Sequence, residues 1–218
     1  MKLSAYIGKY WVGAEVIYAV IIAMTFTSIL RTYIAVPGAS YLPIVYSALF
    51  CCIAWGIADG SFYVWERKYN IRMENYIVDL SGSEQSRDDA ILLIKEQLDD
   101  TILSNIPKEK KQELYRDLVI SLAAAGRKET VSTRDAFTII LGILLISTTA
   151  GLMVVIPFFL TENLNLALNI SNWLGIALLF VIGCYRAQET ELHRMVKSGF
   201  STAVIGILIA SITVFLGG

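Results

Sequence analysis

Two acidic residues interrupt long apolar stretches of this sequence, Glu15 in the first stretch and Asp59 in the second. A carboxylate inside a membrane segment costs roughly 3 kcal/mol of insertion free energy or more, so such residues usually face a protein interior and serve a function. Carboxylate oxygens are the ligands that suit Mg²⁺, Mn²⁺ and Fe²⁺ in proteins. The two acids are therefore candidates for binding a divalent metal ion.

Helical spacing places further oxygen-bearing side chains on the same faces as these acids. Tyr18 and Thr25 share the face of Glu15, and Glu66 shares the face of Asp59. Asp59 precedes Glu66 by seven residues, which is about 10 Å along a helix, and Glu15 lies at a similar short depth. We expect Glu15 and Asp59 to face one another, within one molecule or across a dimer, with the other three along the same ion path.

The alternative interpretation is that the acids are structural. Glu15 lies near the N-terminus of its expected helix, where the helix dipole favours a carboxylate. Asp59 lies in the C-terminal half of its expected helix, where the dipole disfavours an anion, so a functional role is the stronger interpretation there.

The stretches that carry the acids are typical of a membrane protein. Of the 218 residues, 56% are hydrophobic and only 17% are charged, whereas soluble domains average about 25% charged residues. A membrane helix needs about 20 mostly apolar residues. Windows of this kind lie at roughly 11–30, 42–65, 136–160, 170–187 and 198–216. The sequence predicts an all-α polytopic protein with five transmembrane helices, the third of them kinked near its outer end by Pro157.

The chain divides into three predicted parts: helices one and two in 1–65, a helical domain in 66–134, and helices three to five in 135–218. The domain 66–134 is too charged to span a membrane. The second membrane helix is expected to continue into it and to end around Asp79–Ser83. Ser86 is placed to cap the next helix, whose apolar residues recur at helical spacing, namely Ile91, Ile94, Leu98 and Ile102.

Lysines and arginines concentrate before the first window, in 66–134 and in 186–197. The positive-inside rule therefore places the N-terminus and the domain 66–134 in the cytoplasm, and the C-terminus outside. Acids on the predicted helices of the domain form two groups that could collect divalent cations. These are Glu109, Glu113 and Asp117, and Glu96, Asp99 and Asp100. Acids of this kind are more often solvated surface, and lysines are interleaved with them.

Other functions find little support. The net charge is −1, so no strong field predicts nucleic acid as a partner. Cys51, Cys52 and Cys184 lie in apolar runs and are expected to be reduced packing residues. The one histidine, His193, has no accompanying Ser-His or metal motif, so we expect no enzyme activity and no organic cofactor.

The stretch CCIAWGIADG, residues 51–60, resembles a segment of the vacuolar iron transporter (VIT) family. Asp59 aligns with an acid of the family and Trp55 with a methionine. Glu15–Tyr18 resembles the Asp-Val-Ile-Phe of the family's first helix. The family's next acid, in an Asp-Gly pair, falls on Ile22–Ala23, and Gly151–Phe158 is similar to the end of the family's third helix.

This resemblance implies a homodimer in the lipid bilayer, with five membrane helices and a helical cytoplasmic domain. It also implies transport of Fe²⁺ or Mn²⁺, in exchange for protons, with Glu15 and Asp59 on the ion path. The methionine and the second acid of the family are absent here. A non-transporting scaffold or metal sensor that keeps this architecture is therefore the alternative function.

Overall fold

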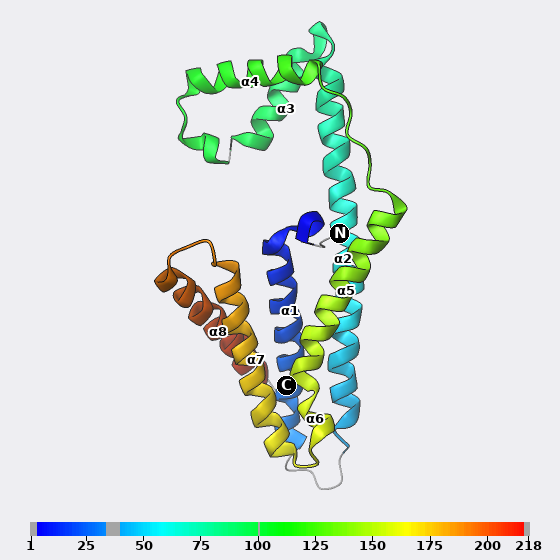
Figure 1. The fold of residues 1–218 in the computed structure, drawn as a ribbon, viewed down its shortest axis with the longest axis vertical. Coiled ribbons are helices and arrows are strands. Elements are labelled where there is room, and N and C mark those ends of the chain that lie inside the picture. The colour runs from blue at the N-terminus through cyan, green and yellow to red at the C-terminus, as the bar shows by residue number, and fades with distance from the viewer. Residues whose placement is uncertain (1–3, 34–39, 100, 216–218) are drawn as a thin grey trace. The chain divides into compact units, whose positions relative to one another are not determined.

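Helices form all the regular structure of the residues described, 4–33, 40–99 and 101–215 (Figure 1), in a computed structural model of the chain. The predicted all-α class is confirmed. In chain order the elements are α1 (Ser4–Tyr33), α2 (Leu42–Ser81), the 3₁₀ turn η1 (Glu84–Ser86), α3 (Arg87–Leu98), the 3₁₀ turn η2 (Ile102–Asn105), α4 (Lys108–Ala123), α5 (Thr133–Val155), α6 (Pro157–Leu160), α7 (Leu164–Arg186) and α8 (Leu192–Phe215).

The chain forms two compact units. Unit 1 contains 1–62 and 133–218, and unit 2 contains 63–132. The division falls within α2, which continues far beyond its apolar part and ends at Ser81, where the sequence predicted. The one proline of α2, Pro43, lies in its first turn, where its missing N–H costs no helical hydrogen bond, so no proline forces this helix to stop at the membrane surface.

Four helical segments of the described residues are long and apolar enough to cross a membrane. They are Tyr10–Arg31, Leu42–Ser81, Thr133–Val155 and Leu164–Arg186, and they coincide with the first four predicted windows. The protein is thus an integral membrane protein. The fifth window, 198–216, falls on α8 and extends past the described residues, so a fifth span stays a prediction.

Two local breaks shape the helices of unit 1. Gly8 has a φ of 77°, a conformation that glycine adopts without the steric cost that a Cβ would add, and α1 changes direction there. Pro157 was predicted to kink the third membrane helix. Instead, α5 ends at Val155 and the proline occupies the first position of the short helix α6, where its missing N–H costs nothing.

Small residues let the helices of unit 1 approach one another closely. In lipid, helix association depends on close packing rather than on removal of apolar surface from water, and glycine allows the closest approach. A Cβ placed on Gly183 of α7 would lie 2.9 Å from the Cα of Gly199 on α8. Gly206 packs on Leu179 in the same pair of helices. Gly199 and Gly206 of α8 therefore lie at its contact with α7.

Unit 2 has its own apolar core, formed by Ile77 of α2, Ala90 and Ile94 of α3, and Tyr115 and Val119 of α4. Burial of these side chains removes apolar surface from water and so stabilises unit 2 through the hydrophobic effect. The helices of unit 1, which pack in lipid, lack this contribution to their association.

The helix that follows Ser86 is shorter than its apolar spacing predicted. It ends at Leu98, and Ile102 belongs to the 3₁₀ turn η2. The Thr101 hydroxyl donates to the Leu98 carbonyl at 2.6 Å and accepts from the Leu103 amide. These local side-chain hydrogen bonds compete with the helical ladder and end α3. Ser86 occupies the N-cap position, but its side chain makes no capping hydrogen bond.

Candidate metal-ion site

Glu15 of α1 and Asp59 of α2 lie side by side within unit 1. The Glu15 side chain is only 1% exposed, and Asp59 is half-buried. The carboxyl group of Glu15 lies against that of Asp59 and against the Trp55 indole. Two carboxyl groups from different helices thus meet inside the apolar bundle.

The two acids have few polar partners. The Glu15 carboxyl group lies within hydrogen-bonding reach of the Asp59 carboxyl group and the Trp55 indole. Neither oxygen of Glu15 nor the Oδ2 of Asp59, however, makes a well-aligned hydrogen bond within the described part of the chain. The charged group that acts on Glu15 is Asp59, a second acid. Buried polar atoms are almost always hydrogen-bonded in native proteins, so atoms left open in this way call for a ligand, an ion or a proton. Two adjacent carboxyl groups in a region of low dielectric cannot both stay ionised unless a cation lies between them; otherwise they share a proton.

Contacts along α1 and α2 hold the pair in register. The rings of Tyr18 and Trp55 meet edge to face, with their centroids 5.7 Å apart. The Cys52 Sγ donates to the Ala19 carbonyl at 3.5 Å. Along these contacts the residue numbers rise on α1 as they fall on α2, so the two helices are antiparallel. The Tyr18–Trp55 and Ala19–Cys52 contacts together fix the register that places Glu15 beside Asp59.

Two glycines on α2, Gly56 and Gly60, press that helix against α5. A Cβ on Gly56 would lie 2.8 Å from the Cα of Leu144, and one on Gly60 would lie 2.9 Å from the Cα of Ile140. Sequence reasoning missed this pair. The signal was present as G-I-A-D-G, a glycine spacing typical of close helix contact in membranes. Asp59 immediately precedes the second glycine, so this contact fixes the rotation of α2 around the acid.

A hydrogen bond extends the same contact toward the middle of the helices. The Ser147 hydroxyl on α5 donates to the Cys52 carbonyl at 2.8 Å, and Ser147 is fully buried. Cys52 also packs against Gly151 of α5. The three helices α1, α2 and α5 are thus joined through Cys52, and the sequence prediction of reduced packing cysteines agrees with its free thiol.

The other residues predicted for the ion path lie at varied distances from the acids. Tyr18 is 46% exposed, and its ring contacts that of Trp55 beside the acids. Thr25 follows Glu15 by ten residues, which is about 15 Å along a helix and too far for both to bind one ion. Glu66 is an exposed residue of unit 2.

The acids of unit 2 are not gathered into a cluster. In the described residues no group of three or more Asp, Glu, His or Cys side chains is placed to hold a metal ion. Asp99 accepts hydrogen bonds from the Tyr115 hydroxyl at 2.7 Å and the Lys111 ammonium at 3.2 Å. These two donors lower the pKa of Asp99. Asp99 thus takes part in a hydrogen bond with Tyr115 and an ion pair with Lys111, both of which are structural contacts. Asp100 lies outside the described residues, and the remaining acids of the two groups are exposed, namely Glu96, Glu109, Glu113 and Asp117.

Comparison with known proteins gives one match. The family described as the VIT family matches residues 92–218, which is more than half of the chain. No curated protein matches the sequence. The matched region contains α4, α5, α6, α7 and α8, whereas Glu15 and Asp59 precede it. The pairing of these two acids is therefore an observation of the structure, independent of the family match.

Proposed function

The chain belongs to the VIT family, whose members transport metal ions across membranes, and on this premise we propose that Glu15 and Asp59 bind the transported divalent ion. The proposal rests on one observation, the two carboxyl groups that lie side by side in the bundle with open oxygens and no basic partner within the described residues. A divalent cation between them would neutralise both charges and satisfy the open oxygens.

The transported ion is Fe²⁺ or Mn²⁺ in this proposal. The ligand atoms that the pair offers are carboxylate oxygens. Trp55 occupies the position where the family has a methionine, so that position supplies no sulfur ligand. Oxygen ligands favour Mn²⁺ and Fe²⁺ over softer ions such as Cu⁺, which prefer sulfur. Tyr18, Thr25 and Glu66 would serve the ion before or after it occupies the pair, as successive rather than simultaneous contacts.

Proton exchange follows from the same chemistry. An acid must lose its proton to bind a metal ion, so binding releases protons and the return of protons displaces the ion. The pair can thus alternate between a metal-bound and a protonated state, which is the requirement for exchange of a metal ion against protons.

The arrangement in the membrane completes the proposal. The N-terminus and unit 2 lie in the cytoplasm, where the lysines and arginines concentrate, and α8 crosses the membrane as a fifth span that brings the C-terminus outside. Two copies form a homodimer, as the resemblance to the family implies. The acids of unit 2, at most, gather ions weakly at the surface before transport.

Metal uptake by the full-length protein in proteoliposomes tests the site. We expect Asp59→Asn and Glu15→Gln each to lower Mn²⁺ uptake roughly tenfold or more, because loss of even an outer partner of a metal ligand costs 10–100-fold. Glu162→Gln is the matched control, since Glu162 is an exposed acid between α6 and α7, and it should transport like the wild type. Unchanged uptake by correctly inserted Asp59→Asn would overturn the proposal.

A further inference from the structure

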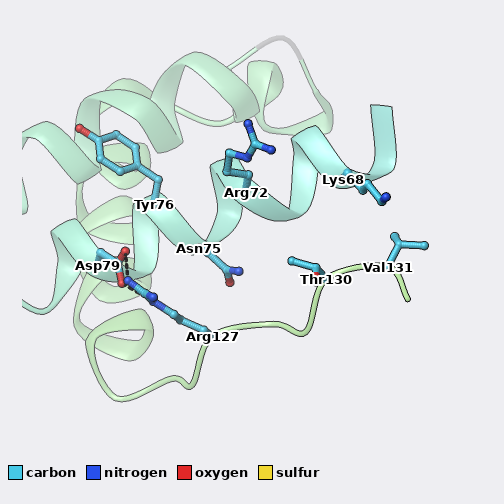
Figure 2. A pocket seen from close by; sticks show the side chains of 8 residues that line it. All are labelled: Lys68, Arg72, Asn75, Tyr76, Asp79, Arg127, Thr130 and Val131. Atoms are coloured by element: carbon cyan, nitrogen blue, oxygen red, sulfur yellow. Dashed lines mark hydrogen bonds and ion pairs between the residues drawn. The ribbon is translucent and has the colours of Figure 1, made fainter. Parts of the chain in front are cut away.

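A basic pocket of about 530 Å³ lies within unit 2, between α2 and the extended segment that follows α4. Figure 2 shows this segment running alongside α2, with Arg127 reaching across to Asp79. A volume of this size falls within the range of small-molecule sites, roughly 300–1,000 Å³.

Three side chains of α2 fasten the start of this segment. The Arg127 guanidinium donates two hydrogen bonds to the Asp79 carboxylate, at 2.8 and 2.6 Å. The Asn75 amide accepts from the Lys128 backbone N–H at 2.8 Å and donates to the Lys128 carbonyl at 3.0 Å. Glu74 pairs with the Lys128 ammonium at 2.6 Å. The wall of the pocket is therefore held by specific hydrogen bonds along one stripe of the helix.

The charges of the pocket do not balance. Asp79 is the acid of the lining, and Arg127 neutralises it and lowers its pKa. Lys68 and Arg72, one helical turn apart on α2, also line the pocket, and neither has an ion-pair or hydrogen-bond partner in the described part of the chain. Thr130 adds a hydroxyl from the segment. Two uncompensated cations and a hydroxyl donor suit a phosphate group.

The place of these cations along α2 indicates where the phosphate comes from. Lys68 follows Trp65, the last residue of the apolar window, by three residues, which is about 5 Å along the helix. Exposed tryptophans mark the level of the lipid headgroups, and Trp65 is 69% exposed. Basic residues immediately beyond a membrane helix attract anionic lipids, at about 1 kcal/mol for each Lys or Arg near the surface.

We propose that this pocket binds the phosphate of an anionic lipid headgroup, with Lys68 and Arg72 as the cations and Thr130 as a hydroxyl donor. The site is independent of the proposed ion path, because none of the residues of that path, Glu66 included, lines the pocket. A free phosphate has the same recognition chemistry but lacks the membrane anchor, so the test must separate the two sources.

Native mass spectrometry of the full-length protein in a mild detergent measures the binding. The probe is dioctanoyl phosphatidic acid, whose phosphomonoester carries close to two negative charges, and dioctanoyl phosphatidylcholine is its neutral counterpart. We expect phosphatidic acid to bind at least tenfold more tightly than phosphatidylcholine. The double variant Lys68→Gln/Arg72→Gln should lose this preference.

The matched control is Lys110→Gln/Arg116→Gln, which removes the same charge from exposed positions of α4 outside the pocket and should keep the preference. Equal binding of phosphatidic acid by the wild type and the Lys68/Arg72 variant would overturn the site. Displacement of bound phosphatidic acid by an equal concentration of inorganic phosphate would overturn the lipid as its ligand. Thermal unfolding confirms that each variant is folded, which is expected because all four side chains are exposed.

Discussion

The carboxyl groups of Glu15 on α1 and Asp59 on α2 lie against one another inside unit 1. The helices α1 and α2 thus meet at the residues whose burial costs the most free energy. Attraction between the two carboxylates cannot explain this contact, because like charges repel. The ring contact of Tyr18 with Trp55 and the hydrogen bond of Cys52 to the Ala19 carbonyl instead hold α1 and α2 together. They support a contact between the two acids that is unfavourable without a cation or a proton. This is the arrangement expected of a binding site, where stability is given up for function.

The first prediction concerns the energetic coupling of the two acids. If both bind one ion, Glu15→Gln should lower Mn²⁺ affinity strongly in the wild type but have little further effect in Asp59→Asn. Residues that act as a unit are non-additive in this way, by about 0.5–3 kcal/mol for side chains in contact. Isothermal calorimetry on the four proteins of this double-mutant cycle measures the coupling. Additive losses would instead mean that the acids act at separate places.

The second prediction concerns metal preference. Trp55 lies against Glu15, so Trp55→Met would place a thioether sulfur beside the two carboxyl groups. We expect its uptake of Fe²⁺ relative to Mn²⁺ to rise about fivefold, equivalent to about 1 kcal/mol, because sulfur prefers the softer ion. Trp55→Leu is the matched control, since it removes the same ring without supplying sulfur. A similar shift in Trp55→Leu would trace the change to space rather than to ligation.

The third prediction concerns the contact between α2 and α5. A Cβ on Gly60 would lie 2.9 Å from the backbone of Ile140, so Gly60→Val should force the helices apart at a cost of about 1–3 kcal/mol. The expected result is a lower unfolding temperature in detergent together with loss of metal binding. Ala58→Val adds volume at an exposed position on the same helix and should leave both unchanged. A stable, active Gly60→Val would show that the contact is not required.

The sequence predicted the position of those residues that belong to a strong local pattern, such as an apolar window or a helical spacing. The apolar windows and the helical spacing of Glu15, Tyr18, Asp59 and Trp55 predicted the faces that meet. The lack of a proline in α2 after Pro43 in its first turn agreed with its long extension. The register of α1 on α2 could not be predicted, because it depends on contacts between helices that are distant in the chain.

The pairing of Asp79 with Arg127 lay beyond prediction for a similar reason. Unit 2 contains many acids and bases, and nothing in their spacing selects this pair over others. The same ambiguity affected Asp99, which the sequence grouped with possible metal ligands but which accepts hydrogen bonds from Tyr115 and Lys111. Competition between partners at a charged surface is settled by tertiary structure rather than by local pattern.

The fourth prediction uses this Asp99 network. Tyr115 and Lys111 lower the pKa of Asp99 in the folded protein, so the ionised acid stabilises unit 2 above its unfolded pKa of about 3.9. That stabilisation is lost as the pH falls through the lower folded pKa. Tyr115→Phe keeps the buried ring but removes the first donor, so its deficit in unfolding temperature should be largest near pH 6 and shrink toward pH 3. Tyr69→Phe, at an exposed position, should show no such trend. A deficit that stays constant with pH would assign the effect to packing.

The fifth prediction concerns the segment that walls the basic pocket. The Lys128 backbone N–H donates to the Asn75 side chain at 2.8 Å, so this amide should exchange slowly with solvent although its segment is extended and exposed. Asn75→Ala removes the acceptor, and a hydrogen bond worth about 1 kcal/mol net corresponds to roughly fivefold faster exchange. Hydrogen–deuterium exchange of the full-length protein measures this, with Asn70→Ala, an exposed asparagine of α2, as the control.

The Arg127–Asp79 pair should keep the start of the segment near α2 in the variant, so exchange should rise at Lys128 more than at Arg127. Equal increases along the whole segment would mean that Asn75 alone fastens it, and no increase at Lys128 would rule out the hydrogen bond in solution.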